Sequence, residues 1–286
     1  MRHCLLITVY KDVESLNRII KYTPSEWGVY IHIDKKSTIL ENQIIDGACV
    51  KGVYKKYKVY WGGVEHLKAF IFLMRMAASS SEKYDFFHLI SGQDFYASSL
   101  SNFDRMVVAN NNYMGIFPLP NKHWGWESGY SIFKYRTFSS KADIRKQPWR
   151  LMNSILKYSQ IFLRVYRKLP DYPLFGGPVY SSLSYDFVKW CLESPMAKDL
   201  LTRLNNSTCA EEVYFQTLIM NSPFRDTIQK DVTLRYINWN ANPAPKYLDI
   251  DDYAEILKSN SLFCRKIDSI QSASLIEKLE LLCSKS

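Results

Sequence analysis

Residues 84–96, YDFFHLISGQDFY, decide the fold that we expect for this chain. The first part, residues 85–90, is rich in aromatic and branched apolar side chains and leads into a Ser91-Gly92 turn. Such a run is typical of a buried strand at the centre of a parallel sheet. Because ligands of open α/β sheets lie at the carboxyl ends of strands, Asp94, which follows the turn, is a candidate site residue. The alternative is that Asp94 caps a helix beginning near Ser98.

The rest of the first hundred residues alternates between strand and helix patterns. Strands are predicted at residues 4–10, 28–34 and 50–59, and helices at 13–20, 38–45 and 64–78. This alternation predicts an α/β fold with a Rossmann-like, mainly parallel central sheet flanked by helices. Further along, we expect a helix over 98–110, a strand over 113–118 and a closing helix over 269–286. The chain has no G-x-G-x-x-G or Walker-type motif, so a dinucleotide cofactor is not expected.

Length and composition describe an ordinary globular protein with an excess of positive charge. The 286 residues carry 37 Lys and Arg against 28 Asp and Glu, and this net charge of +9 favours an anionic partner. No run of 18 apolar residues is present, and the six cysteines are scattered without a C-x-x-C pair. These patterns predict no membrane-spanning segment, and free thiols in a reducing cytoplasm rather than disulfides or a zinc site.

Much of the positive charge lies in residues 141–168, which contain eight Lys and Arg and one acidic residue. Arg150, Lys157 and Arg164 are seven residues apart, so we expect them on one stripe of a helix, with Leu151 and Phe162 largely on another side. The pattern resembles a basic amphipathic helix lying on anionic lipid, and a solvated charged face is the alternative. Because these charges do not interleave with exposed aromatics and no nucleic-acid motif occurs, a nucleic-acid partner is not expected.

Six motifs, taken together and in order, resemble one family. The motifs are YIHIDKKS at 30–37, VYWGG at 59–63, FHLISGQDF at 87–95, CAEEVYFQT at 209–217, YINW at 236–239 and LFCRKID at 262–268. The set looks like the core-2/I-branching β-1,6-N-acetylglucosaminyltransferases and the related protein O-xylosyltransferases. The resemblance implies a GT-A-like fold, a UDP-sugar donor, inversion at the anomeric carbon and no metal cofactor.

The resemblance also suggests how the chain is organised and where it works. We expect a single glycosyltransferase domain, with a nucleotide-binding half at 1–118, an acceptor and catalytic half at 119–268 and a C-terminal helix at 269–286. The animal enzymes carry a membrane anchor and lumenal disulfides, which this sequence does not show. We therefore expect a bacterial, cytoplasmic member that builds a surface glycan, with peripheral attachment to the inner face of the membrane left open.

The residues fit the chemistry of inverting glycosyl transfer. One carboxylate must take the proton of the acceptor hydroxyl, and positive charge must stabilise the departing diphosphate. Many GT-A enzymes hold a divalent ion with Asp-x-Asp, but the central strand here ends in Ser-Gly-Gln-Asp, with a single acid. The literal Asp249-Ile250-Asp251 lies at a predicted helix start, where a capping role is expected. Lys and Arg side chains would then replace the metal.

The resemblance assigns the donor side of the site as follows. Glu212 corresponds to the general base, and Glu211 before it is expected to be a support or cap. Lys266 matches the diphosphate-binding lysine. The other donor-side candidates are Arg265, Lys246, Asp34 with His32 near the uridine, and Asp94 by the donor sugar or acceptor.

The acceptor side is less determined by the sequence. Trp239 resembles a residue that packs on the acceptor sugar, and Glu127 and Arg136 are candidates for holding acceptor hydroxyls. Glu211, the expected support or cap, is also counted on the acceptor side. The family usually has Gly-Ser, one residue and an aromatic before the late strand, whereas this chain has GGPVY at 176–180. The acceptor, a glycan or lipid-linked glycan, therefore stays open. UDP-GlcNAc is the leading donor, with UDP-xylose, UDP-glucose or a non-catalytic nucleotide-sugar or glycan-binding module as alternatives.

Overall fold

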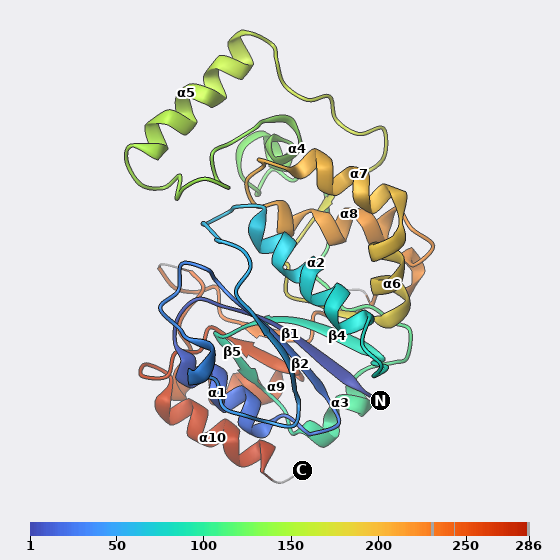
Figure 1. Cartoon of the computed structure of the whole chain (residues 1–286), viewed down its shortest axis with the longest axis vertical. Coiled ribbons are helices and arrows are strands. Elements are labelled where there is room, and N and C mark those ends of the chain that lie inside the picture. Colours follow the sequence, from blue (N-terminus) through green and yellow to red (C-terminus); the bar gives the residue numbers. More distant parts are fainter. Residues whose placement is uncertain (230–231, 243, 285–286) are drawn as a thin grey trace.

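The computed structural model describes residues 1–229, 232–242 and 244–284. Its centre is a five-stranded sheet in the order β3-β2-β1-β4-β8 (Figure 1). Strands β1 to β4 are parallel to their neighbours, and β8 alone runs antiparallel, beside β4. The strands are β1 His3–Val9, β2 Gly28–Ile33, β3 Val50–Tyr54, β4 Phe86–Ser91 and β8 Ser182–Ser184. The predicted α/β class with a mainly parallel central sheet is confirmed.

Both faces of this sheet are covered by helices, which is why its central strands are apolar throughout. Along β1, Leu6 belongs to one core and its neighbours Leu5 and Ile7 to the other, as the two-residue period of a strand requires. Helices α2 Glu65–Ala78, α6 Tyr185–Glu193, α7 Pro195–Leu204 and α8 Tyr214–Met220 contribute to the first core. Helices α1 Val13–Tyr22, α9 Tyr253–Lys258 and α10 Ala273–Cys283 contribute to the second (Figure 1).

The last third of the chain returns to the end of β4 and forms a second, three-stranded sheet. Its strands are β5 Asp94–Tyr96, β10 Phe263–Arg265 and β9 Arg235–Ile237, in the order β5-β10-β9. Strand β10 runs antiparallel to β5, so Arg265 lies directly opposite Asp94. This pairing brings two distant motifs of the sequence to the carboxyl end of β4. A two-stranded ribbon of β6 Phe117–Pro118 and β7 Phe175–Gly176 completes the strands.

Several predicted elements are shorter than expected because side chains replace the backbone bonds. The strand predicted at 50–59 ends at Tyr54, since the amide of Tyr57 donates to His32 Nε2 instead. The helix predicted at 38–45 is only a 3-10 turn, Glu41–Gln43. The helix predicted at 98–110 is reduced to the 3-10 turn Leu100–Asn102 and α3 Phe103–Met106. The strand predicted at 113–118 survives as β6 and one isolated bridge of Tyr113 to Ser182.

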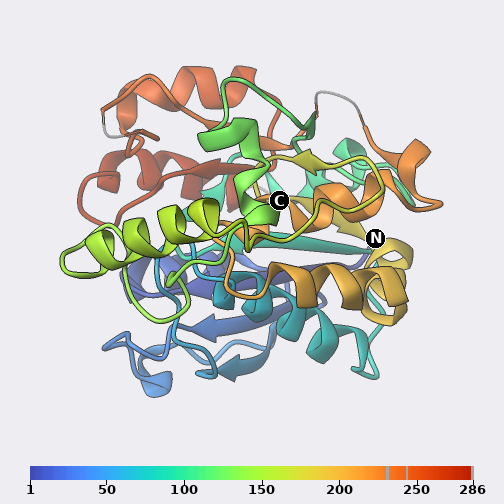
Figure 2. The same cartoon turned by 90° about the horizontal axis from the view of Figure 1, so that it is seen from above.

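Helix α5, Trp149–Phe162, lies at the end of the molecule farthest from the central sheet, beyond the short α4, Ser131–Lys134 (Figures 1 and 2). The prediction of a basic stripe along it was wrong. Arg164 comes after the helix end and has a left-handed backbone, with φ of 54°. Lys157 turns inward, with Nζ 3.2 Å from the centroid of the Trp126 ring. The predicted C-terminal helix is α10, and residues 285 and 286 lie outside the described residues.

Candidate active site

The carboxyl ends of β1, β4 and β10 meet at one edge of the molecule, and polar side chains gather there. Thr8 near the end of β1 pairs in register with Ser91 at the end of β4. Ser91 is followed by the turn to Asp94, whose partner strand brings Arg265. Ligands of open α/β sheets bind outside this edge, so the candidate site is built from the residues around it.

The acidic pair of the site lies on a 3-10 turn, Ala210–Glu212, directly before α8. The sequence predicted both acids in the first turn of a longer helix, but Val213 has non-helical dihedrals and separates the two elements. The turn is held by two glycine loops. The amide of Cys209 donates to the carbonyl of Gly62 at 2.8 Å, and the amide of Gly177 donates to the carbonyl of Glu212 at 2.9 Å.

The glycine at 177 is needed because the backbone passes close to another segment. A Cβ at this position would overlap the carbonyl oxygen of Gly115. The same loop is fixed to α8 by the side chain of Gln216, whose Nε2 donates to the carbonyl of Pro178 at 2.8 Å. The Gly-Gly-Pro sequence, which departs from the family pattern, is therefore the segment that positions the backbone of Glu212.

Glu211 is buried and is held in place by a histidine that the sequence did not single out. His66, at the start of α2, has Nδ1 3.4 Å from Glu211 Oε1 and Nε2 3.2 Å from Thr8 Oγ1. His66 thus links the acidic turn to the end of β1. Glu211 Oε2 is buried and makes no hydrogen bond within the described residues. Because Glu211 is buried, its charge is poorly screened by water and acts on the pKa of Glu212.

Glu212 is the acid of the pair that is suited to proton transfer. Its side chain is partly exposed, and burial together with the charge of Glu211 raises its pKa to about 7. A carboxylate with a pKa near the working pH can accept a proton in the transition state and still be ionised beforehand. The geometry thus separates a supporting acid, Glu211, from a candidate base, Glu212.

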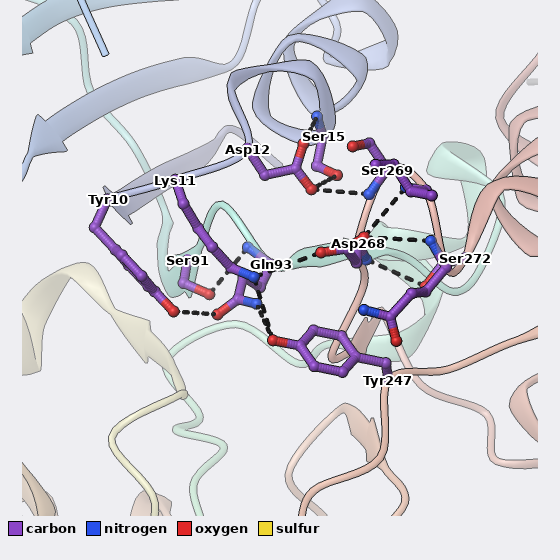
Figure 3. A network of polar contacts seen from close by, with 12 residues as sticks. Tyr10, Lys11, Asp12, Ser15, Ser91, Gln93, Tyr247, Asp268, Ser269 and Ser272 are labelled. Atoms are coloured by element: carbon purple, nitrogen blue, oxygen red, sulfur yellow. Dashed lines mark hydrogen bonds and ion pairs between the residues drawn. The ribbon is translucent and has the colours of Figure 1, made fainter. Parts of the chain in front are cut away.

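Two lysines lie near the side chain of Tyr247 at this edge, and Figure 3 shows one of them, Lys11, with Tyr247 and Gln93. Lys11 Nζ donates to the hydroxyl of Tyr247 at 3.2 Å and lies 3.4 Å from a carboxylate oxygen of Asp268. Lys266 Nζ lies 5.7 Å from the centroid of the Tyr247 ring. Gln93, in the turn after β4, donates to the same hydroxyl at 3.4 Å. Lys11, Gln93 and Tyr247 belong to segments far apart in the sequence, and the fold brings them together.

Lys266 is the more available of the two cations. Among the residues that the structure describes, its ammonium has no carboxylate within ion-pair distance. Burial lowers the pKa of Lys266, and the charges of Arg265 and Lys11 lower it further. An anion placed between Lys11 and Lys266 would relieve this repulsion, so the lysine pair is a ready site for a phosphate group.

Arg265 and Asp94 form a buried ion pair rather than a free cation and a free acid. Arg265 Nη1 lies 3.2 Å from Asp94 Oδ2, and that oxygen also accepts from the amide and hydroxyl of Ser91 at 2.8 and 2.6 Å. Asp94 has no exposed surface. The expected contact of Asp94 with donor or acceptor sugar is therefore not supported by the geometry, and its role is to hold Arg265. Desolvation explains this, because an unpaired charge at either position would be costly.

Tyr180 connects the two halves of the site. The guanidinium carbon of Arg265 lies 3.4 Å from the centroid of the Tyr180 ring. Burial raises the pKa of Tyr180, and the charges of Asp94 and Glu211 contribute to the same direction. Because Tyr180 is within electrostatic reach of Glu211 and stacks on Arg265, the acidic turn and the cationic strand end lie on the same edge of the sheet.

His32 and Asp34 hold the chain after β2. Burial lowers the pKa of His32 to about 4, so its Nε2 is neutral and accepts from the amide of Tyr57. Asp34 Oδ1 accepts from the amides of Lys36 and Val59 at 3.0 and 3.1 Å. Both side chains thus shape the loop that follows the strand, and the expected proximity to uridine stays a prediction.

Lys246 is not free to bind a diphosphate. Its Nζ lies 2.9 Å from Asp249 Oδ2 and 2.8 Å from Asp252 Oδ2, and these hydrogen bonds raise its pKa. Asp249 Oδ1 accepts from the amide of Asp251 at 3.1 Å at the start of the 3-10 turn Ile250–Asp252. The capping role predicted for the Asp-Ile-Asp sequence is confirmed, and the suggestion for Lys246 is replaced by this pairing.

Besides Glu211, the acceptor-side candidates Trp239, Glu127 and Arg136 differ in their exposure and in their hydrogen-bond partners. Trp239 follows β9 and is 59% exposed, as a stacking platform would need. Glu127 is already engaged, since Oε2 lies 2.9 Å from Lys134 Nζ and Oε1 accepts from Tyr135 at 2.8 Å. The side chain of Arg136 is exposed. The binding of acceptor hydroxyls by Glu127 and Arg136 stays a prediction, and in Glu127 it would compete with the internal partners.

A cavity of about 150 Å³ lies next to the acidic turn. Trp126 and Tyr135, whose rings are stacked with centroids 4.7 Å apart, form part of its wall, and Lys157 and Thr208 contribute the polar part. Thr208 precedes Glu211 by three residues. A second cavity, of about 340 Å³, lies by Ser98, Asn260 and Leu282 and has no ionisable residue in its lining. Of these two cavities, the smaller one is the one lined by a residue close to the acidic turn.

The sequence reasoning missed His66, Lys11 and Tyr247. Lys11 had a usable signal, because it follows the first predicted strand directly. His66 lies three residues after the WGG turn, at the start of a predicted helix. For Tyr247 no such signal exists, since only the return of the late chain to β4 gives it partners.

The structure also bears on ions, thiols and membrane spans. In residues 1–229, 232–242 and 244–284, no group of three or more His, Cys, Asp or Glu side chains is placed to hold a metal ion. All six cysteines are free thiols. Over the same described ranges, no helix has both the length and the apolar character that crossing a bilayer requires.

The candidate site thus combines an acid of raised pKa, Glu212, with two lysines near the carboxyl edge of an α/β sheet. The profile of the Core-2/I-Branching enzyme family matches residues 5–259. The chain belongs to this family of glycosyltransferases, and together with the topology this membership bears out the predicted GT-A-like fold class.

Curated relatives agree with this assignment. Xylosyltransferase 1 of Canis lupus familiaris is 26% identical over 221 residues, covering 74% of this chain and 21% of that protein. Xylosyltransferase oxt of Drosophila pseudoobscura pseudoobscura is 22% identical over 310 residues, covering 98% and 33%. The chain thus spans about a fifth to a third of the length of these relatives. Among solved structures, the bifunctional glycosyltransferase WbbM in its apo form is similar at 12% identity and a TM-score of 0.46, covering all of this chain and 50% of that one.

Proposed function

We propose that this chain is an inverting, metal-independent glycosyltransferase that transfers a sugar from a UDP-sugar to a hydroxyl of a glycan acceptor. The observation that carries the proposal is the geometry of the acidic turn: Glu211 is buried and held by His66, which also contacts Thr8 at the end of β1, and the partly exposed Glu212 follows it. Burial and the charge of Glu211 raise the pKa of Glu212 to about 7. This arrangement, together with two lysines at the ligand-binding edge of the α/β sheet, supports the role of general base for Glu212.

In the proposed reaction the acceptor oxygen attacks the anomeric carbon from the face opposite the nucleotide. Glu212 takes the hydroxyl proton as the new C–O bond forms, and the bond between the sugar and UDP breaks with its electron pair going to the β-phosphate oxygen. Glu211 stays in place through His66 and keeps the pKa of Glu212 high. Removing such a base costs roughly 10²-fold or more in rate.

Positive charge for the departing diphosphate would come from Lys11 and Lys266. This charge supports a mechanism without a metal, because ammonium groups can stabilise the same developing negative charge. Arg265 is paired with Asp94 and directly precedes Lys266 at the end of β10, so its proposed role is to hold this end of the strand in place. Lys246 has two aspartate partners at 2.9 and 2.8 Å, whereas Lys11 has one, Asp268, at 3.4 Å and Lys266 has none among the described residues, so we assign the diphosphate to Lys11 and Lys266.

The sugar and the acceptor are the finer parts of the proposal. GlcNAc is the leading sugar from the sequence motifs. Xylose is the second candidate, because the curated relatives are named xylosyltransferases. For the acceptor we propose a glycan or lipid-linked glycan, met on the cytoplasmic side of a membrane. A non-catalytic nucleotide-sugar-binding module is the remaining alternative from another class.

The test is turnover with a panel of UDP-sugars and glycan acceptors in excess EDTA. We expect UDP release with one donor, and a loss of roughly 10²-fold or more in Glu212→Gln. Glu277→Gln, on the exposed face of α10, is the matched control and should keep wild-type activity. UDP binding without turnover would favour the binding module. Loss of turnover in EDTA that Mg²⁺ restores would refute metal independence.

Lysine variants separate the two candidate cations from the excluded one. Lys266→Ala is expected to weaken UDP binding, and Lys246→Ala to leave it unchanged, because that ammonium is already paired. Calorimetric titration with UDP alone measures both without needing the acceptor. Equal losses in the two variants would contradict the assignment.

A further inference from the structure

The side of helix α5 that faces the protein is mixed: Asn153 and Gln160 make hydrogen bonds there, and the half-buried Trp149 and Leu156 lie on the same side. Asn153 Oδ1 accepts from the amide of Phe138 at 3.0 Å. Gln160 is buried, and its amide group pairs with the backbone of Arg136, accepting at 2.9 Å and donating at 3.0 Å. An amphipathic helix on a globular domain normally turns its apolar side to the core. In α5, by contrast, a longer apolar stripe lies on the side away from the protein.

The apolar side of α5 consequently faces solvent. Leu151, Ile155, Tyr158 and Phe162 follow one another at intervals of four, three and four residues, so they form one stripe of the helix. Their exposed fractions are 57%, 60%, 64% and 86%. The stripe continues beyond the helix end into Leu163, Val165 and Tyr166, which are also exposed. Figures 1 and 2 show α5 at the outer end of the molecule.

Basic side chains border this stripe. Segment 141–168 has eight Lys and Arg and one acid, and the acid, Asp143, is paired with Arg145 at 2.8 Å. The further exposed cations are Lys141, Lys146, Arg150, Arg164 and Lys168. We use the name α5 docking surface for the stripe Leu151, Ile155, Tyr158 and Phe162 with these five cations. A contiguous apolar surface of this kind marks an interaction site.

We propose that the α5 docking surface binds an anionic phospholipid bilayer, with the helix lying in the plane of the interface. The apolar stripe would enter the boundary between headgroups and acyl chains, and the basic residues would contact the negative headgroups. Charge complementarity selects this occupant over a second copy of the chain, because pairing two α5 surfaces would bring their cations side by side. The aromatic rings of Tyr158 and Tyr166 suit the headgroup level of a membrane.

The side of α5 opposite the docking surface, together with the segment before the helix, contacts the region of the acidic turn, so binding would orient the site. Lys157 of α5 and Thr208, just before the acidic turn, line the same cavity of about 150 Å³. Arg145 lies with its guanidinium carbon 4.9 Å from the centroid of the Trp61 ring, next to the glycine that holds Cys209. A bilayer on α5 would therefore lie at the Glu212 end of the molecule. This corollary rests on the proposed function and favours a lipid-linked acceptor within it.

The experiment is flotation of the full chain with vesicles, without donor or acceptor. Vesicles of phosphatidylcholine are compared with vesicles that also contain about 30% phosphatidylglycerol. We expect binding to the anionic vesicles alone, and a weakening of it at roughly 0.5 M salt. The variant Leu151→Ser/Ile155→Ser/Phe162→Ser and the variant Arg150→Gln/Arg164→Gln/Lys168→Gln are each expected to reduce binding about tenfold or more.

The control variant Val108→Ser/Leu281→Ser removes comparably exposed apolar side chains elsewhere and should bind like the wild type. Because all the substituted side chains are exposed, thermal unfolding should be unchanged in every variant. Wild-type protein that does not float, or an apolar variant that floats as well, would overturn the proposal. So would a dimer in light scattering that the apolar variant converts to a monomer. Turnover without flotation refutes only this inference, and flotation without turnover refutes only the proposed function.

Discussion

Replacing Glu211 with Gln tests the origin of the raised pKa of Glu212. The amide is isosteric with the carboxyl and retains an oxygen for the contact with His66 Nδ1. The change therefore removes a charge and leaves the acidic turn in place. If the charge of Glu211 helps to keep Glu212 protonated, its removal must lower the pKa of Glu212 and extend activity to lower pH.

The size of the shift follows from the two causes. Burial is the larger cause and the charge of Glu211 the smaller, and together they raise the pKa from 4.5 to about 7. Removing the smaller cause should move the pKa down by roughly one unit or less, which corresponds to about 1.4 kcal/mol. With a pKa near 6, the ionised fraction of Glu212 at pH 6 would rise about fivefold over wild type.

The assay is kcat/KM for UDP release between pH 5 and 9, each profile being normalised to its own alkaline plateau. Wild type should lose activity as pH falls through about 7, the value at which Glu212 becomes protonated. In Glu211→Gln the midpoint should lie lower, and in the control Glu277→Gln it should not move. An unchanged midpoint, or a shift to higher pH, would refute the electrostatic explanation.

The stability of Glu212→Gln gives a second measurement that does not require turnover. Because the folded-state pKa lies above 4.5, the native state binds the proton more tightly, and the wild type loses stability as pH rises from about 4.5 through about 7. Gln carries no charge at any pH. The variant should therefore gain stability relative to wild type at pH 8, by up to about 3 kcal/mol, and gain little at pH 4. Urea unfolding at the two pH values measures the difference.

Asp94→Asn should destabilise the protein by about 3–5 kcal/mol, because Arg265 would remain buried without a counter-charge; a loss below about 1 kcal/mol in urea unfolding would contradict the buried pair. Lys11→Ala and Lys266→Ala should each weaken UDP binding about tenfold in calorimetry, because each removes one charged partner of the diphosphate. Unchanged UDP affinity in both variants would rule out the lysine pair as the diphosphate site. Gly177→Ala should cost about 1–3 kcal/mol or more, because its Cβ would overlap a backbone carbonyl oxygen; an unchanged melting temperature would show that the loop can move aside.

The central strands and the two acids of the acidic turn could be located from the sequence. Buried strands such as residues 85–90 can be recognised in the sequence as continuous apolar runs, because both faces of the sheet are covered. Glu212 was found through a local motif. The strand that ends at Tyr54 was predicted too long. The amide of Tyr57 donates its hydrogen bond to the side chain of His32, and this contact between distant residues exists only in the folded chain.

The sequence by itself determined the order of strands and helices, the family motifs and the excess of positive charge in 141–168. Only the tertiary structure decided which charges are paired, because pairing depends on residues distant in the chain. Asp94 is paired with Arg265 and Lys11 with Asp268, and Lys11 and Lys266 both lie near the ring of Tyr247. The tertiary structure also decided that α5 turns its apolar stripe outward. A helical period shows that a helix has two sides, but the contacts of its polar residues settle which side the protein covers.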